Sequence, residues 1–299
     1  MKDLILAVSY GYTRVQLGVF LGSLKASGFS GDLVLFVGGT DRHNIDQIRA
    51  AGAKIIPFSY PYRNCTKLRN PLHPLWMYIR RFLKMCGGNI DLLQTLAAPF
   101  LNLGILRFLF YRNFLQRYGD DYGSVFLTDL RDVCFQASPF EAAPRGQLRV
   151  YLEEAGPTLG ACPNNSRWIM ELYGDEELAK LSSYPIICAG TTLGSRDKVV
   201  GYLDAFVRSL PEARSVMRMG VDQGIHNYLI RNGRCPEAVL CPNRFSEVLT
   251  MGFMGSQQVS DSYRSGVISD STGRPYAVIH QFDRHAEVAQ AFADKYLFH

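Results

Sequence analysis

The alternation of apolar runs and helical segments in the first 58 residues is the feature that most constrains the fold. Apolar runs cover residues 4–8, 33–37 and 54–58, and helical periodicity covers residues 15–27 and 45–51. Strands and helices in this order form a parallel sheet with helical crossovers. We therefore predict an α/β fold with a mostly parallel central sheet flanked by helices.

The rest of the chain continues this pattern less regularly. We predict further strands at residues 124–128, 148–152, 185–194, 238–240 and 277–280, and helices at residues 108–115, 164–173, 195–210 and 222–231. The segment 185–194 is expected to end in a turn of small residues, and residues 252–273 are expected to form loops. Because no repeat or linker interrupts the pattern, we predict one domain over residues 1–299, with a nucleotide-type first half.

The composition indicates the cellular compartment of the protein but does not decide its function. The net charge of +5 and the pI of about 8.8 suit an anionic ligand, an anionic membrane face or nucleic acid. Seven cysteines without CxxC or zinc-type spacing predict free thiols in a reducing compartment, which here means the cytoplasm. The first residues enter a strand directly, so we expect no secretory leader.

Two sequence segments bear on membrane contact. Residues 92–111 form the most apolar long segment, but Asn102, Gly104 and Arg107 interrupt it, so we predict no membrane span there. Residues 63–84 are basic and carry aromatic residues, which favours contact with an anionic membrane or a glycolipid over a nucleic-acid role. The alternative for that segment is an ordinary solvated helix face.

Two carboxylates follow the apolar run at residues 124–128. Asp129 and Asp132 stand at the predicted carboxyl end of a strand, with Arg131 between them. An ordinary interpretation is that one caps a turn and the other pairs with a base. Unpaired acids at the end of a central strand are costly, however, and carboxylate oxygens suit Mg²⁺ or Mn²⁺. We therefore predict a divalent metal site, which His280 at the end of the last strand could complete, although a lone histidine there is more often structural.

The loop after the first strand is where α/β folds place a nucleotide. It follows Val8 and contains Ser9, Tyr10, Tyr12 and Arg14. A tyrosine could stack on a base and the arginine could meet a phosphate. The loop has neither a GxGxxG nor a Walker sequence, so an ordinary polar turn is the alternative.

Asp222 and Gln223 begin a predicted helix. Aspartate is favoured at a helix start for capping alone. The adjacent amide of Gln223 is suited to contact a sugar hydroxyl or a reacting centre.

These elements, in this order, resemble the GT-A glycosyltransferases, and most closely the retaining galactosyl- and glucosyltransferases of the glycogenin-like type. The acids Asp129 and Asp132 resemble the family's DxD element with one extra residue between them, and His280 is similar to its late metal-binding histidine. Asp222 and Gln223, with Asn227, resemble its Asp-Gln-x-x-x-Asn helix start.

Two further parts of the resemblance concern the donor sugar. Arg112 is similar to the family's donor-binding arginine on the helix before the acids. Ala189, Gly190 and Thr191 are similar to a small-residue turn that lines the sugar, with Cys188 where the family has asparagine.

The resemblance implies a Rossmann-like GT-A domain that binds nucleotide through residues 1–136 and sugar and acceptor through residues 137–299. It implies transfer of a hexose from a nucleotide-diphosphate sugar, with UDP favoured, to a hydroxyl of a glycan, glycolipid or protein. Mn²⁺ or Mg²⁺ would be held by Asp129, Asp132 and His280. The donor would contact Val8, Ser9, Tyr10, Tyr12, Arg14, Arg112, Thr128, Arg131, Ala189, Gly190 and Thr191.

The stereochemistry of transfer stays open. If configuration is retained, Gln223 would lie near the anomeric carbon. If it is inverted, a general base is needed, and Asp222, Glu153 or Glu154 is the candidate. The alternatives to transfer are a catalytically inactive nucleotide-sugar-binding protein of the same fold and a phosphohydrolase. We predict a cytoplasmic protein with a peripheral contact to the inner face of a membrane, and no nucleic-acid partner.

Overall fold

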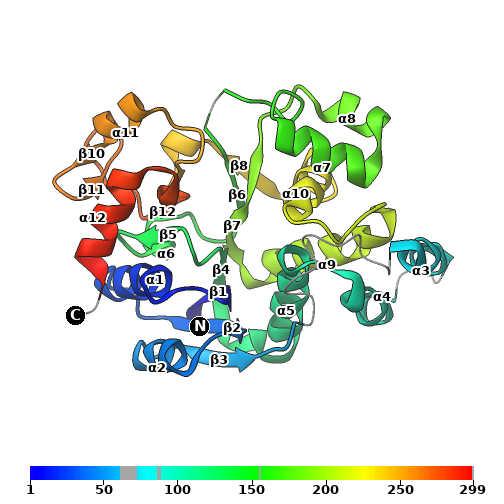
Figure 1. Cartoon of the computed structure of the whole chain (residues 1–299), viewed down its shortest axis with the longest axis horizontal. Helices are drawn as coiled ribbons and strands as arrows, with labels where there is room; N and C mark the ends of the chain where they lie inside the picture. Colours follow the sequence, from blue (N-terminus) through cyan, green and yellow to red (C-terminus); the bar gives the residue numbers. More distant parts are fainter. Residues whose placement is uncertain (61–72, 86–88, 155, 298–299) are drawn as a thin grey trace.

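The computed structural model of the chain describes residues 1–60, 73–85, 89–154 and 156–297 (Figure 1). Part of the basic segment predicted to meet a membrane, including Arg63, Lys67 and Arg69, lies outside the described residues, as do Cys65 and Cys86. The other five cysteines are free and buried, in agreement with the sequence.

A seven-stranded sheet with the order β3-β2-β1-β4-β7-β6-β8 forms the centre of the molecule. Its strands are β1 (Lys2–Tyr10), β2 (Asp32–Gly38), β3 (Lys54–Pro57), β4 (Tyr122–Thr128), β6 (Leu148–Leu152), β7 (Ile187–Ser195) and β8 (Ala238–Cys241). The sheet is mixed, because β7 runs antiparallel to both β4 and β6, while the other neighbours are parallel. The α/β prediction is confirmed, and β7 is the departure from a parallel sheet.

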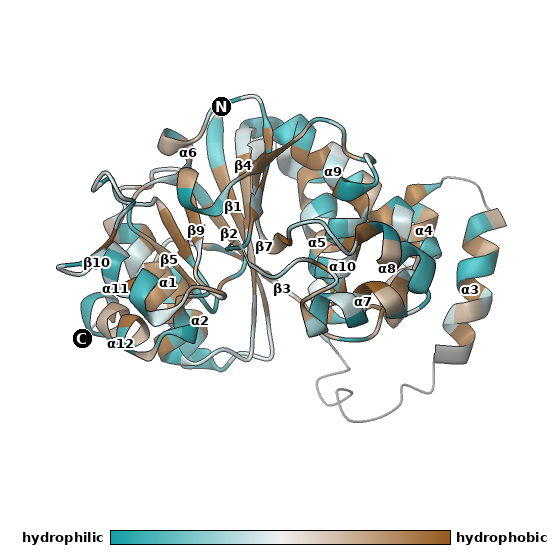
Figure 2. Cartoon of the chain, turned by 90° about the horizontal axis from the view of Figure 1, so that it is seen from above, coloured by the Kyte–Doolittle hydropathy of each residue, from teal (hydrophilic) through white to brown (hydrophobic). Residues whose placement is uncertain are grey.

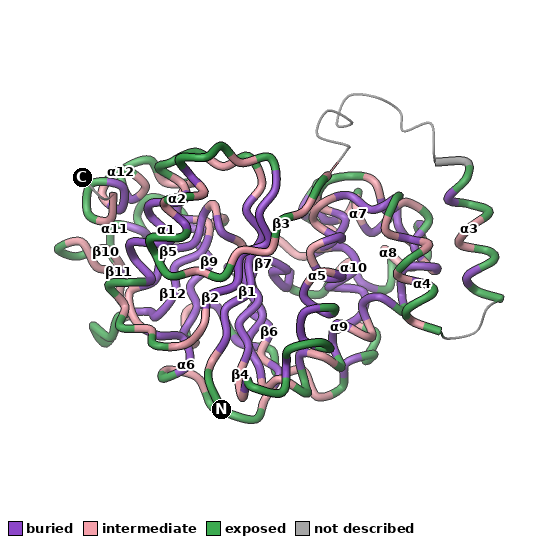
Figure 3. Tube along the Cα trace, turned by 90° about the horizontal axis from the view of Figure 1, so that it is seen from below, coloured by how far each residue is buried: buried purple, intermediate pink, exposed green. Residues whose placement is uncertain are grey.

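Helices cover both faces of this sheet (Figure 1). The helices of the described residues are α1 (Arg14–Ala26), α2 (Arg42–Ala50), α3 (His73–Met85), α4 (Ile90–Ala97), α5 (Leu103–Tyr118), α6 (Pro139–Ala142), α7 (Pro163–Tyr173), α8 (Asp175–Leu181), α9 (Arg196–Ser209), α10 (Val221–Arg231), α11 (Ser256–Ser262) and α12 (Ala286–Tyr296). Alternate residues of β1 face two different cores. Leu4 and Leu6 pack with α5 and α9, whereas Ile5 and Ala7 pack with α1. Figure 3 shows the strands buried between these layers.

The strand order reverses at β1. The chain runs from β1 to β2 and β3 on one side, and then returns to place β4 on the other side of β1. In open α/β sheets, ligands bind beyond the carboxyl ends of the strands at such a point. The carboxyl ends of β1 and β4, at Tyr10 and Thr128, therefore define the expected position of a site.

A second, three-stranded sheet lies next to this position. It consists of β5 (Val133–Phe135), β12 (Val278–His280) and β9 (Val248–Thr250). Strand β5 comes from the predicted first half of the chain, whereas β12 and β9 come from the second. The two predicted halves therefore contribute strands to the same small sheet. The segment 252–273 is not only loop, since it contains α11 and the hairpin of β10 (Tyr263–Arg264) and β11 (Val267–Ile268).

Within the residues that the structure describes, no helix has both the length and the apolar character needed to cross a bilayer. The apolar segment 92–111 is divided between α4 and α5 and packs in the interior.

Candidate metal centre

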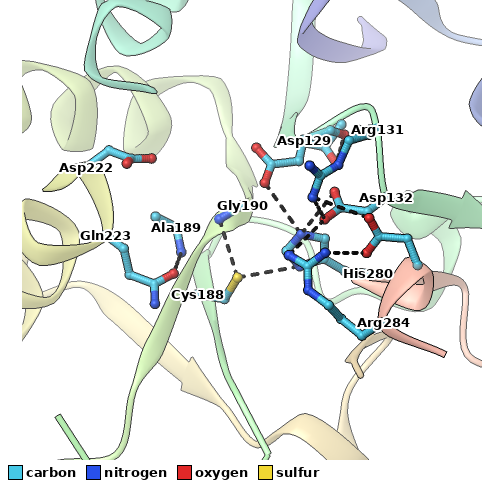
Figure 4. A network of polar contacts seen from close by, with 12 residues as sticks. Asp129, Arg131, Asp132, Cys188, Ala189, Gly190, Asp222, Gln223, His280 and Arg284 are labelled. Carbon is cyan, nitrogen blue, oxygen red and sulfur yellow. Dashed lines mark hydrogen bonds and ion pairs between the residues drawn. The ribbon is translucent and has the colours of Figure 1, made fainter. Parts of the chain in front are cut away.

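Asp129, Asp132 and His280 come together in space, although almost 150 residues separate the second acid from the histidine. One ligand atom from each lies within 4.8 Å of the others. The Nε2 atom of His280 is 3.5 Å from Asp129 Oδ2 and 3.8 Å from Asp132 Oδ1 (Figure 4). This nitrogen is buried and makes no hydrogen bond within the described residues. A buried nitrogen without a hydrogen bond, directed at two carboxylates, fits a metal ligand, so this group could hold a cation.

Strand pairing explains why the three ligands meet. Asp129 directly follows β4, and its N–H donates to Gly190 O at 2.7 Å, which extends the pairing with β7. Asp132 directly precedes β5, and in the register of β5 with β12 His280 is opposite Val133. The N–H of Gln281 also donates to Asp132 O at 2.8 Å.

Gly190 is required by close approach and not by a turn. The predicted turn at residues 189–191 is wrong, because these residues lie inside β7. A Cβ at Gly190 would come within 2.5 Å of His280 Cε1 and 2.6 Å of Asp129 Oδ2. Only glycine lets the backbone of β7 pass beneath the ligands.

Cys188 orients the histidine from behind. Its Sγ is 3.4 Å from His280 Nδ1 and also accepts the N–H of Gly190 at 3.4 Å. Burial raises the pKa of the thiol, so it stays protonated near neutral pH. The direction of this contact decides the tautomer of a neutral ring. If the thiol donates to Nδ1, the ring hydrogen is on Nε2; if the sulfur accepts from the Nδ1 hydrogen, the lone pair of Nε2 is free to bind a metal.

Arg107, on α5, is a site residue that the sequence did not single out. Its guanidinium pairs with Asp129, with Asp222 Oδ2 at 3.0 Å and with Ala189 O at 3.1 Å. Burial alone would raise the pKa of Asp129, but Arg107 and His280 hold it well below its usual range. The available signal was that Arg107 is the single charged residue in the apolar segment 92–111.

Arg112 does not reach the site. Its side chain is 1% exposed and bonds Asp204 Oδ1 at 2.6 Å and Asp91 Oδ1 at 2.9 Å. Arg112 therefore joins α5 to α9 and α4, on another face of the helix from Arg107. The prediction that Arg112 contacts a donor is corrected, and Arg107 is the α5 arginine at the metal centre.

Asp132 is the less compensated of the two acids. Arg131 Nη2 lies 3.3 Å from its Oδ2 and from Asp283 Oδ2, and Arg284 Nη2 lies 3.9 Å from Asp132 Oδ2. Burial nevertheless raises the pKa of Asp132, since the repulsion of Asp129 and Asp283 adds to it. The two arginines are about half exposed, so they can turn towards an anion as well.

Gln223 and Asp222 lie on the other side of β7 at the start of α10 (Figure 4). The amide of Gln223 donates to Asn165 Oδ1 at 3.0 Å and accepts the Ala189 N–H at 3.5 Å. Asp222 is buried, which raises its pKa, although Arg107 opposes this. The side chain of Asn227 bonds both the N–H and the C=O of β7 residue Ile187 and fixes the helix on the strand.

The two glutamates that follow β6 differ. Glu153 is buried, and burial raises its pKa while the nearby charge of His280 opposes the shift. Glu154 is paired with Arg244 at 2.9 Å and accepts from Asn243 at 3.1 Å. Glu154 therefore has a structural role, whereas Glu153 lies beside the predicted catalytic amide.

The loop after β1 contributes unequally. Tyr12 lies near the acids, and burial together with the charges of Asp129 and Asp132 raises its pKa to about 12. Tyr10 donates to Tyr60 O at 3.2 Å and packs edge-on against that ring. Arg14 is exposed in the first turn of α1.

The remaining predicted donor contacts are buried strand residues. Val8 belongs to the core on the α5 side of the sheet. Thr128 donates to Asp129 O at 2.9 Å. The hydroxyls of Ser9 and Thr191 are buried and make no hydrogen bond within the described residues.

No protein-family model matches this chain, and a search of curated proteins finds no match either.

Proposed function

We propose that the protein is a metal-dependent glycosyltransferase with a Rossmann-like GT-A fold, which moves a hexose from a nucleotide-diphosphate sugar to a hydroxyl group. The observation that carries the proposal is the position of Asp129, Asp132 and His280, at the carboxyl end of β4 and beside the reversal of strand order at β1. Nucleotides bind at this position in open α/β sheets.

The donor set favours Mn²⁺, with Mg²⁺ as the alternative, because two carboxylates and one imidazole suit a fairly hard cation. Such a cation, when bound, offsets the charge that develops on a diphosphate leaving group. Arg131 and Arg284 are half-exposed guanidinium groups on the Asp132 side, where they can bind the same diphosphate. Tyr10 ends β1 and Tyr12 follows it, and both offer rings for a base. A UDP-sugar is the donor we favour.

The sugar is proposed to lie over residues 189–191 of β7. Gln223 is held between Asn165 and Ala189, which fixes its amide next to that strand. In a retaining reaction, this amide would lie by the anomeric carbon. Asp222 holds Arg107, and therefore acts mainly as a positioning residue. In an inverting reaction, Glu153 is the better base, since its raised pKa brings it closer to neutrality.

We also propose that the acceptor is a glycan, glycolipid or protein hydroxyl and that the protein works in the cytoplasm. The five described cysteines are buried free thiols, which supports a reducing compartment.

A donor screen tests the proposal. The chain is heated with each common nucleotide sugar, with and without Mn²⁺, and transfer to simple glycoside acceptors is measured in parallel. We expect one donor to raise the melting temperature only with metal, and Asp132→Asn to lower transfer by about 10³-fold. Asp120→Asn, at an exposed acid in the same half of the chain, is the matched control.

Three results would count against transfer. Equal activity of Asp129→Asn, Asp132→Asn and the unaltered chain would remove the metal centre from the reaction. Metal-dependent stabilisation without turnover would favour an inactive nucleotide-sugar-binding protein. Hydrolysis of a generic phosphate ester would favour a phosphohydrolase.

A further inference from the structure

Helix α3 lies at the outer edge of the molecule, far from the metal centre (Figure 2). One side of it is anchored in the core. Trp76 and Leu83 are buried, and the indole N–H of Trp76 donates to Ala213 O at 3.2 Å, just after the 3-10 turn Leu210–Glu212. The buried side already provides the packing that holds this amphipathic helix to the protein.

The other side of α3 is also apolar but faces solvent. Leu75, Tyr78, Phe82 and Met85 have relative exposures of 47%, 69%, 52% and 83%. Their spacing of three, four and three residues puts them along one line of the helix, which we call the exposed stripe. Figure 3 shows exposed positions alternating with buried ones along α3. A line of four large apolar side chains in water is unusual unless another surface covers it.

Every charged residue of α3 is basic. Arg80 and Arg81 line an open pocket of ≈ 590 Å³ with Arg214 and with Met77, Glu171 and Ser215, which we call the arginine pocket. The one acid of the pocket, Glu171, is paired with Arg218. In the part of the chain that the structure describes, none of the three pocket arginines forms an ion pair. Burial and the nearby charges of Arg214 and Arg81 lower the pKa of Arg80, as expected for crowded like charges.

We propose that α3 docks the protein on an anionic lipid surface, with the exposed stripe at the boundary of headgroups and acyl chains and the arginine pocket around lipid phosphates. A helix with an apolar line and only basic charges matches such an interface in both hydrophobicity and sign. Arg81 lies next to the stripe on the helix surface, and its long stem lets the charged group reach the headgroups there. Arg80 lies across the helix from the stripe and adds to the positive field of this face.

Two other occupants of this face fit less well. A second copy of the chain would bring its own arginines against these, and like charges across an interface oppose association. A single-stranded nucleic acid would need a run of aromatic platforms for its bases, whereas only two of the four stripe residues, Tyr78 and Phe82, are aromatic. The proposal does not depend on glycosyl transfer, because it uses none of the residues of the metal centre.

Vesicle sedimentation tests the proposal with the full chain. Vesicles of phosphatidylcholine alone are compared with vesicles that contain one third phosphatidylserine, at low and high salt. We expect binding to the anionic vesicles only, weakened by salt. Replacing Arg80, Arg81 and Arg214 together by Gln should weaken it about 100-fold, since each basic residue contributes about a factor of five. Tyr78→Ser with Phe82→Ser should weaken it about tenfold at unchanged net charge.

The matched control is the triple variant Arg42→Gln, Arg145→Gln and Lys295→Gln. It removes the same charge from exposed positions on or next to α2, α6 and α12, at the opposite end of the molecule (Figure 1). It should bind vesicles within about twofold of the unaltered chain if the effect is local. Equal losses in both triple variants would overturn the proposal, because general charge would then explain binding. Equal binding to neutral vesicles, no binding at all, or a dimer that Phe82→Glu separates would overturn it too.

Discussion

The metal centre and the arginine pocket are two charged regions of the protein, and the fold compensates their charges differently. At the metal centre, Asp129 is partly buried and directly paired with the buried guanidinium of Arg107. In the pocket, Arg80, Arg81 and Arg214 surround open space and form no ion pair within the described residues. The first region balances charge inside the fold, while the second leaves it for something outside.

This difference has an energetic basis. A buried charge without a partner costs several kcal/mol, so the acids of the metal centre need Arg107 or a cation to be tolerated. Charges that border solvent are screened and cost little. Removing a charge should therefore destabilise the first region and relieve the second.

The largest effect is expected at Arg107. Arg107→Gln leaves the buried Asp222 and the partly buried Asp129 without their cation, which should lower the free energy of unfolding by about 3 kcal/mol in EDTA. Mn²⁺ should recover part of this loss, because it supplies charge to Asp129. Urea unfolding with and without metal measures both quantities.

Arg112→Gln is the matched control, since it removes a buried, doubly paired arginine from the same helix. It should destabilise by a similar amount, but adding metal should not change the loss. If metal rescues both variants equally, the contrast between the two arginines fails.

A middle-sized effect is expected at Gly190. Gly190→Ala puts a methyl group against His280 and Asp129, so metal affinity should fall by about 10- to 100-fold. Titration calorimetry with Mn²⁺ measures this. Gly201→Ala in α9, where a methyl group has nothing closer than 3.9 Å, should leave the affinity unchanged. Unaltered metal binding by Gly190→Ala would mean that the ion does not sit between these ligands.

The smallest effect has the opposite sign. Arg80→Gln relieves repulsion from Arg81 and Arg214, and should raise the free energy of unfolding by about 0.5 kcal/mol at low salt. The gain should disappear in 0.5 M NaCl (roughly a 4 Å screening length). Arg42→Gln, on an exposed turn of α2, should show no comparable gain. Loss of stability in Arg80→Gln would show that the pocket charge is compensated within the fold.

Strand and helix patterns both located the main elements, and the helices predicted at residues 164–173, 195–210 and 222–231 correspond to α7, α9 and α10. The apolar runs located β1, β2, β3, β4 and β6, and the acids and the histidine at strand ends come together as expected. Strand direction is not encoded in such runs, so the antiparallel course of β7 was not predicted. The glycine at position 190 indicated a turn in the sequence. In the structure, glycine is needed there because His280 packs directly against the backbone of β7.

Helix α5 shows why the arginine was misassigned. Arg107 and Arg112 are five residues apart, which rotates them by roughly 140° around the helix. One faces the metal centre and the other faces α9. The hydrophobic pattern does not indicate which face of α5 points to the metal centre, because apolar residues occur all around this helix and it is buried on several sides.

The pairing of β5 with β12 also sets an order of events during synthesis. Arg107, Asp129 and Asp132 emerge from the ribosome before His280, and the interval of almost 150 residues lasts on the order of ten seconds or more at usual elongation rates. During that time Arg107 can already neutralise Asp129. The third ligand arrives only when β12 enters between β5 and β9. Insertion of this three-residue strand, and not formation of the large sheet, is therefore the folding step that creates the complete set of metal ligands.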